Sequence, residues 1–126
     1  VAPQPRHRAG DCEAQLGDFV GSMARLRSNL VGGLDYEGYV AEVKAIERAY
    51  RRIPVDALAL SCLRAAGTPG ERALNRYIAA ANSWTDCVEA PSCQSVSIEA
   101  ELQRQWRLAS GNLSKAQRGL RRLSSS

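Results

Sequence analysis

The four cysteines of this 126-residue chain are the side chains best placed to do chemistry. Cys12, Cys62, Cys87 and Cys93 lie where helices are expected to end, and no two of them form a Cys-x-x-Cys pair. Their spacings do not suit a four-thiolate zinc site, whereas their even number favours two disulfide bonds. Small buried thiols in a reduced protein are the other interpretation. Because disulfides persist mainly in oxidising compartments, we expect a secreted or extracytoplasmic protein.

Metal and cofactor chemistry has little support in the sequence. The only histidine, His7, precedes the expected helices, so the Glu-x-x-His pattern of di-iron bundles is absent, as is the Cys-x-x-Cys-His pattern of c-type haem. Met23 lies on an apolar helix face, where a methionine usually fills the core. The sequence therefore predicts no metal ligand, no cofactor and no catalytic residue.

Paired carboxylates are the remaining basis for an enzyme, which is the second alternative function. Glu42 and Glu47 flank the apolar face of one expected helix, and Asp86 and Glu89 lie near the end of another. General acid–base catalysis would need such groups around one substrate. Glu47 stands four residues before Arg51, however, which is the spacing of an ion pair on a helix surface.

Aromatic side chains suggest the first alternative function, a small-molecule-binding or sensor bundle with a tyrosine-lined interior. All of these side chains fall on the apolar faces of expected helices: Tyr36, Tyr39, Tyr50, Tyr77, Trp84 and Trp106. A pocket of this kind suits an aromatic or sugar ligand. The same spacing is also typical of core residues whose hydroxyls reach a backbone carbonyl or solvent. We expect the two tryptophans to be largely buried.

Positive charge gathers at the C-terminal end of the chain. Residues 1–100 carry eleven basic and twelve acidic side chains, whereas residues 101–126 carry six basic and one acidic. The six basic residues occupy outer positions of the last expected helix and form the candidate binding surface: Arg104, Arg107, Lys115, Arg118, Arg121 and Arg122. Such a stripe suits anionic lipid headgroups or an acidic wall polymer, and a solvated outer face is the plainer interpretation. No helix-turn-helix spacing precedes the stripe, so we expect no nucleic-acid partner.

Four expected helices position these residues. Apolar side chains recur with gaps of three and four residues, which is typical of helices that bury one face. The four faces comprise Cys12, Leu16, Phe19, Met23, Leu26 and Leu30; Tyr36, Tyr39, Val43, Ile46, Tyr50 and Ile53; Leu74, Tyr77, Ala81, Trp84 and Val88; and Leu102, Trp106, Ala109, Leu113, Ala116, Leu120 and Leu123. No strand-like alternation competes with them, so the predicted fold class is all-α.

Turn and cap residues mark the expected helix boundaries. Gly32 and Gly33 suit the C-terminal end of the first helix, and Asp35 suits the N-cap of the second. Pro54 ends the second helix and suits the first turn of a short one. The sequence Thr68-Pro-Gly-Glu71 has the form of a capping box, which predicts that the third long helix begins there.

Short connections make successive helices antiparallel neighbours, so we predict an up-down-up-down four-helix bundle. A short extra helix over residues 55–63 is expected to cap one end, between the second and third long helices. This topology brings Cys12 beside Cys62 at that end and Cys87 beside Cys93 at the opposite end. The bundle is therefore predicted to be stapled by these two disulfides.

The expected domain organisation is simple. Residues 11–123 form a single helical-bundle domain, residues 1–10 a disordered tether and residues 124–126 a flexible tail. No apolar run approaches the length needed to cross a bilayer, so no transmembrane segment is expected in this chain. The first residues read as a mature terminus, left after an export segment or joined to a membrane anchor upstream. Fifteen of the seventeen basic residues are arginines, which suggests GC-rich coding and a bacterial source.

These features favour a non-enzymatic exported helical module. We expect it to bind an unknown partner protein or an anionic envelope surface, as the folded part of a lipoprotein or of a larger membrane protein.

Overall fold

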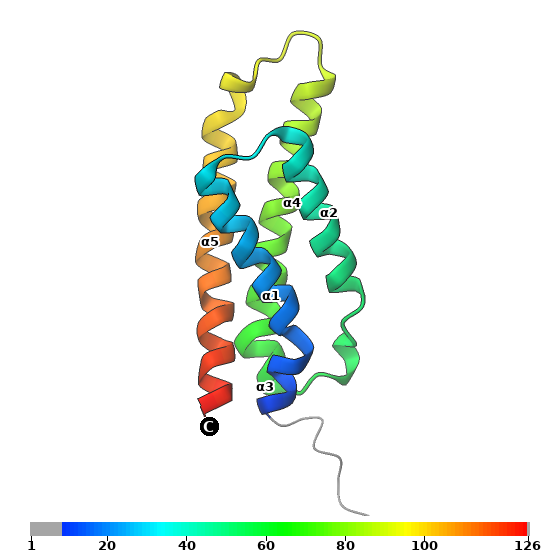
Figure 1. The fold of residues 1–126 in the computed structure, drawn as a ribbon, viewed down its shortest axis with the longest axis vertical. Coiled ribbons are helices and arrows are strands. Elements are labelled where there is room, and N and C mark those ends of the chain that lie inside the picture. The colour runs from blue at the N-terminus through cyan, green and yellow to red at the C-terminus, as the bar shows by residue number, and fades with distance from the viewer. Residues whose placement is uncertain (1–8, 126) are drawn as a thin grey trace, which may run out of the picture.

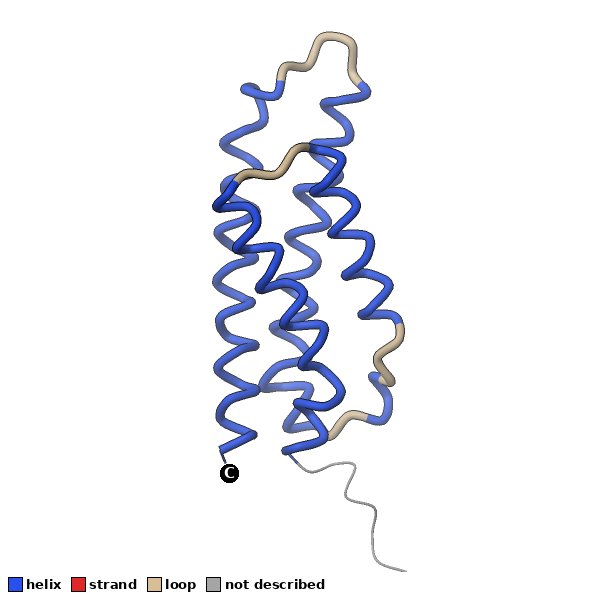
Figure 2. Tube along the Cα trace, viewed as in Figure 1, coloured by secondary structure: helices blue, strands red, loops and turns tan. Residues whose placement is uncertain are grey.

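The computed structural model describes residues 9–125, which are almost wholly helical and contain no strand (Figure 2). The elements are α1 (Ala9–Gly32), α2 (Tyr36–Arg51), the 3₁₀ turn η2 (Val55–Ala57), α3 (Leu60–Cys62), the π-helical turn η3 (Leu63–Gly67), α4 (Thr68–Glu89) and α5 (Ser95–Ser125). The predicted all-α class is therefore confirmed, with four long helices.

The four long helices lie side by side along the length of the molecule (Figure 1). Helix α5 packs along α4 and α1, and α2 packs against α4 and α1. The α1–α2 turn and the α4–α5 loop lie toward one end of the molecule (Figure 1). The start of α1, helix α3 and the C-terminal end of α5 lie toward the other end, which is the end that holds the candidate site described below.

The core is built from the apolar faces expected from the sequence. Its members are fully or almost fully buried: Leu16, Phe19, Met23 and Leu26 from α1; Tyr39, Val43 and Ile46 from α2; Leu74, Tyr77 and Ala81 from α4; and Leu102, Ala109, Leu113, Ala116 and Leu120 from α5. Trp84 and Trp106 pack against the core and are of intermediate exposure, so they are largely but not fully buried, as predicted. Both lie at the edge of the core, and Val88, on the same face as Trp84, is 55% exposed.

The turn between α1 and α2 follows the expected chemistry. Gly33 has a φ of 95°, a conformation that a residue without Cβ adopts at no steric cost. The Asp35 carboxylate accepts a hydrogen bond from the backbone N–H of Gly38 at 2.7 Å, which satisfies one of the unpaired donors in the first turn of α2. These two residues fix where α1 ends and α2 begins.

The segment before α4 differs from the prediction. Residues 55–63 do not form one short helix, because a single 3₁₀ turn is followed by helical backbone that runs unbroken from Leu60 into α4. Thr68 is itself helical, with φ −66° and ψ −47°, and its side chain caps nothing. The expected capping box is therefore wrong. Glu71 instead accepts a hydrogen bond from the Tyr50 hydroxyl.

Three features let the helix continue through this segment. The sequence Leu63-Arg-Ala-Ala consists of strong helix formers, and buried Ala66 anchors it in the core. Pro69 has no N–H for the carbonyl of Ala65, and its ring would clash with that carbonyl in a regular α-helix. The wider π turn over η3 accommodates this proline, with the N–H of Thr68 bonded five residues back to the carbonyl of Leu63.

The structure joins Cys12 to Cys62 and Cys87 to Cys93, the two pairs expected from the sequence. Their Cα atoms are 5.5 Å and 5.1 Å apart, which suits an unforced disulfide. The first bridge spans 50 residues and ties α1 to α3, and the second spans six residues across the α4–α5 loop. On a chain-entropy estimate they contribute about 4 and about 2 kcal/mol respectively.

Other expectations about organisation stay predictions. The described helices begin at Ala9 and end at Ser125, and most of the expected tether lies outside the described residues. Within residues 9–125, no helix combines the length and the apolar character that a membrane span requires.

Candidate functional site

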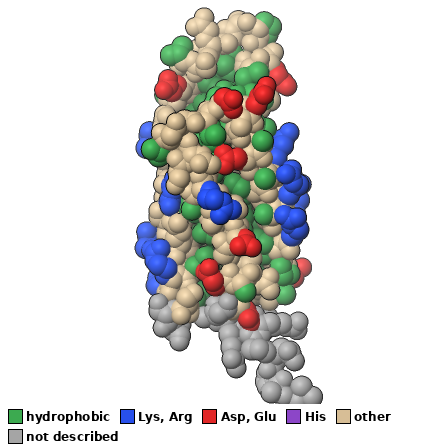
Figure 3. Space-filling model, viewed as in Figure 1, with side chains coloured by type: hydrophobic (Ala, Val, Ile, Leu, Met, Phe, Trp, Pro, Cys, Tyr) green, Lys and Arg blue, Asp and Glu red, His purple; other side chains and the backbone are tan. Residues whose placement is uncertain are grey.

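Basic side chains gather around one cleft near the C-terminal end of α5. The cleft has a volume of about 820 Å³, and α5 lines one wall of it while η3 and the first turn of α4 line the other. Its lining residues, which we call the basic cleft, are Arg64, Ala65, Pro69, Lys115, Arg118, Arg121 and Arg122. Five of these seven residues are cationic and none is acidic. Figure 3 shows Lys and Arg side chains along the lower edge of the molecule on its α5 side.

The two walls of the basic cleft approach each other closely at Gly119. A Cβ added to Gly119 of α5 would lie 1.9 Å from the carbonyl oxygen of Ala65, which is closer than any side chain tolerates. Only glycine therefore allows α5 to rest directly on the π turn. This contact fixes Arg64 opposite the basic residues of α5.

The basic residues of α5 in the cleft point outward, as the sequence predicts. Lys115, Arg118 and Arg122 are exposed and follow one another at spacings of three and four residues, so they share one helix face. Like charges at this spacing repel one another, and the arrangement lowers helix stability unless an anion is present. The concave wall also focuses the positive potential, which raises the local concentration of anions.

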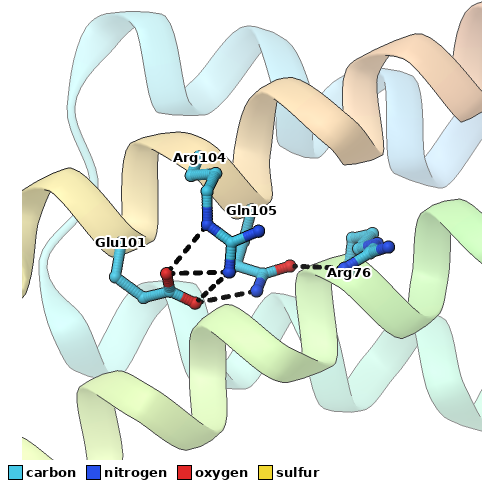
Figure 4. Close-up of polar contacts among 4 residues, drawn as sticks. All are labelled: Arg76, Glu101, Arg104 and Gln105. Atoms are coloured by element: carbon cyan, nitrogen blue, oxygen red, sulfur yellow. Dashed lines mark hydrogen bonds and ion pairs between the residues drawn. The ribbon is translucent and has the colours of Figure 1, made fainter.

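Arg104 does not belong to the basic cleft. Its guanidinium donates two hydrogen bonds to the Glu101 carboxylate, from Nε and from one terminal nitrogen, both at 3.0 Å (Figure 4). Hydrogen bonds from Gln105 and Arg104 lower the pKa of Glu101. Buried Gln105 also accepts a bond from Arg76 at 3.4 Å, so the group links α5 to α4. This network is structural and leaves Arg104 neutralised.

Arg107 is likewise outside the basic cleft and lies in a second groove, between α1 and α5. The structure therefore brings together four of the six basic residues selected from the sequence. Sequence reasoning missed Arg64, because its segment carries no run of charge. The nearest signal in the sequence was Pro69, which a regular α-helix does not accommodate in its interior.

The carboxylates considered for catalysis do not converge. Glu42 accepts a hydrogen bond from Asn29 at 2.8 Å, and Glu47 pairs with Arg51 at 3.6 Å, as its spacing indicates. Asp86 and Glu89 lie in the last turn of α4, whereas Glu42 and Glu47 belong to α2. Across the described part of the chain, no group of three or more His, Cys, Asp or Glu residues is placed to hold a metal. His7 lies outside the described residues.

The four tyrosines do not share one cavity. Tyr36 is hydrogen-bonded to Thr85 at 2.7 Å, whereas Tyr50 bonds Glu71. Partial burial, together with the hydrogen bond to Glu71, raises the pKa of Tyr50 to about 12. These two hydroxyls are therefore engaged in contacts between helices.

Tyr39 is the most fully satisfied of the tyrosines. Its hydroxyl donates to the backbone carbonyl of Tyr77 at 2.7 Å and accepts from the Trp106 indole N–H at 3.0 Å. Burial raises the pKa of Tyr39 well above its usual range. Trp106 packs edge-on against the Tyr39 ring with centroids 5.5 Å apart, and Trp84 packs at a tilt with centroids 5.8 Å apart. Tyr39 is therefore a core residue, and its hydroxyl is not offered to a ligand.

Comparison of the chain with protein-family models, with curated proteins and with solved structures gave no match. Function is therefore inferred from the geometry of the molecule itself.

Proposed function

We propose that this protein is a non-enzymatic extracytoplasmic helical module that binds an anionic surface of the cell envelope through the basic cleft. The single observation that carries the proposal is the convergence of five cations from two separate segments on one concave site. A charged helix face that only keeps a protein soluble does not require a cation from a second segment opposite it. Phosphate or carboxylate groups fit the site, because guanidinium groups bind both in a bidentate manner.

The extracytoplasmic location is proposed from the disulfides. Two cross-links in a chain of 126 residues are typical of oxidising compartments and rare in the cytosol. Anchoring as a lipoprotein and a bacterial source stay predictions from the sequence. An acidic partner protein is the competing ligand for the same cleft, and the experiment below distinguishes the two.

We further propose that the four helices form an antiparallel up-down-up-down bundle over residues 11–123. Support comes from the short α1–α2 and α4–α5 connections and from the packing of α5 against both α1 and α4. In this arrangement the Cys12–Cys62 bridge holds the end that carries the basic cleft.

Vesicle binding tests the proposed function. The wild-type protein is expected to co-sediment with phosphatidylglycerol vesicles at low ionic strength, to be released steeply as salt is added, and to ignore phosphatidylcholine vesicles. A Lys or Arg near an anionic surface contributes about 1 kcal/mol each, so the triple substitution R118Q/R121Q/R122Q should weaken partitioning about 100-fold.

A charge-matched variant serves as the control. R48Q/R52Q/R107Q also removes three positive charges, but all three lie outside the basic cleft. We expect it to retain most of the vesicle binding. Equal loss in both variants would mean that net charge alone drives adsorption, which contradicts the proposal. Absence of vesicle binding together with cleft-dependent capture of one acidic protein would move the assignment to the competing ligand.

A further inference from the structure

A second groove lies between α1 and α5, with α4 beneath it. It has a volume of about 350 Å³, within the range of small-molecule sites. Its lining residues, which we call the Trp106 groove, are Arg27, Leu30, Val31, Tyr77, Gln103, Trp106, Arg107 and Ser110. None of them lines the basic cleft, and none is acidic.

Tyr77 lines this groove from α4, and its hydroxyl is the unusual feature. The side chain is 0% exposed, and its hydroxyl has no hydrogen-bond partner within the described residues. A buried polar group without a partner is costly, so most are paired in folded proteins. Burial raises the pKa of Tyr77 to about 12, partly opposed by Arg27, so the hydroxyl keeps its proton at neutral pH. The Tyr77 hydroxyl is therefore a hydrogen-bond donor without an acceptor among the described residues.

The other walls of the groove are held in place before any ligand arrives. The Trp106 ring is oriented by the hydrogen bond from its indole N–H to the Tyr39 hydroxyl at 3.0 Å. The Arg27 guanidinium reaches across to α5 and donates to Ser114 at 3.2 Å and to Gln117 at 3.0 Å. Arg107 is exposed at the rim. The groove thus combines a fixed aromatic wall, two cations and one buried donor.

We propose that the Trp106 groove binds a small aromatic carboxylate. The aromatic ring lies against the indole of Trp106 and the side chain of Leu30. The carboxylate accepts from Arg107 with one oxygen and from the Tyr77 hydroxyl with the other, which requires the side chains that cover Tyr77 to shift when the ligand binds. A carboxylate fits better than a larger polyanion. Arg27 already donates to two α5 side chains, so only the Arg107 guanidinium is left to pair fully with an anion. The site does not depend on the proposed function of the basic cleft.

Calorimetric titration with 2-naphthoate tests this site. The wild-type protein is expected to bind one equivalent saturably, whereas uncharged 2-naphthamide should bind at least about 10-fold more weakly, as expected for loss of a charge-assisted hydrogen bond. R107Q should weaken 2-naphthoate binding by a similar factor. Binding of the amide as tightly as the acid would contradict the assignment of the carboxylate.

Tyr77→Phe gives the more discriminating result. It removes the unpaired hydroxyl and keeps the ring, so the melting temperature should stay the same or rise while 2-naphthoate binding weakens severalfold. R118Q/R122Q in the basic cleft should leave this binding unchanged. Lack of saturable binding, equal affinity in Y77F and wild type, or loss of binding in R118Q/R122Q would each overturn the proposal. The vesicle experiment is unaffected by any of these outcomes, because R107Q and Y77F leave the basic cleft intact.

Discussion

The two ends of the α4–α5 helix pair each lie beside a disulfide, yet they differ in packing and in charge. At one end, Gly119 rests directly on the backbone of Ala65, and five cations surround the contact. At the other end, the α4–α5 loop extends beyond the α1–α2 turn (Figure 1). There Val88 and Val96 are 55% and 71% exposed.

Charge follows the same division. The loop end of the pair carries Asp86, Glu89 and Glu99, all exposed, whereas the opposite end carries the basic cleft. A pair of helices with charge separated in this way orients itself on an anionic surface with one end first. Tight packing and concentrated charge therefore occur together, because the glycine contact brings Arg64 to the basic face of α5.

Removing the long disulfide should have the largest effect. Cys12→Ala with Cys62→Ala opens a 50-residue loop, so the free energy of unfolding should fall by about 4 kcal/mol. Cys87→Ala with Cys93→Ala opens a six-residue loop and should cost about 2 kcal/mol. Denaturant unfolding of both double variants measures the difference. A larger loss from the short bridge would show that the loop end, and not the cleft end, limits stability.

Substitution at the glycine contact should have the next largest effect. Gly119→Ala forces a methyl group against the Ala65 carbonyl, so η3 and α5 must separate, at a cost of about 3 kcal/mol. Gly111→Ala is the matched control on the same helix, since an added Cβ meets nothing within 4 Å there. That control should stabilise the protein by up to about 1 kcal/mol through helix propensity. Similar unfolding midpoints for the two variants would contradict the close approach of the two segments.

The apolar faces and the disulfide partners could be predicted from the sequence, because both depend on periodicity and on short connections. Val43, Leu113 and Ala116 are buried where their spacing places them. The depth of burial could not be predicted in the same way. Trp106 lies on the expected face but at the edge of the core. A spacing of three and four residues predicts the direction in which a side chain points, but not how deeply it is buried.

The helix start at Thr68 could not be predicted for a different reason. A capping box is a local pattern, and here tertiary contacts outweighed it: Cys62 is bonded to Cys12, and Ala66 is buried. Helical backbone therefore extends back to Leu60. The basic cleft depends on this outcome, because Arg64 reaches it only from the π turn. Four members of the cleft were thus visible in the sequence, and the wall that faces them was not.

Hydrogen–deuterium exchange in the presence of phosphatidylglycerol vesicles tests whether the cleft end is the end that binds. We expect bound vesicles to slow backbone exchange at the cleft end, in residues 63–70 and 115–122, and to leave residues 87–98 at the loop end unchanged. Protection confined to residues 87–98, or spread evenly over the four helices, would contradict this expectation.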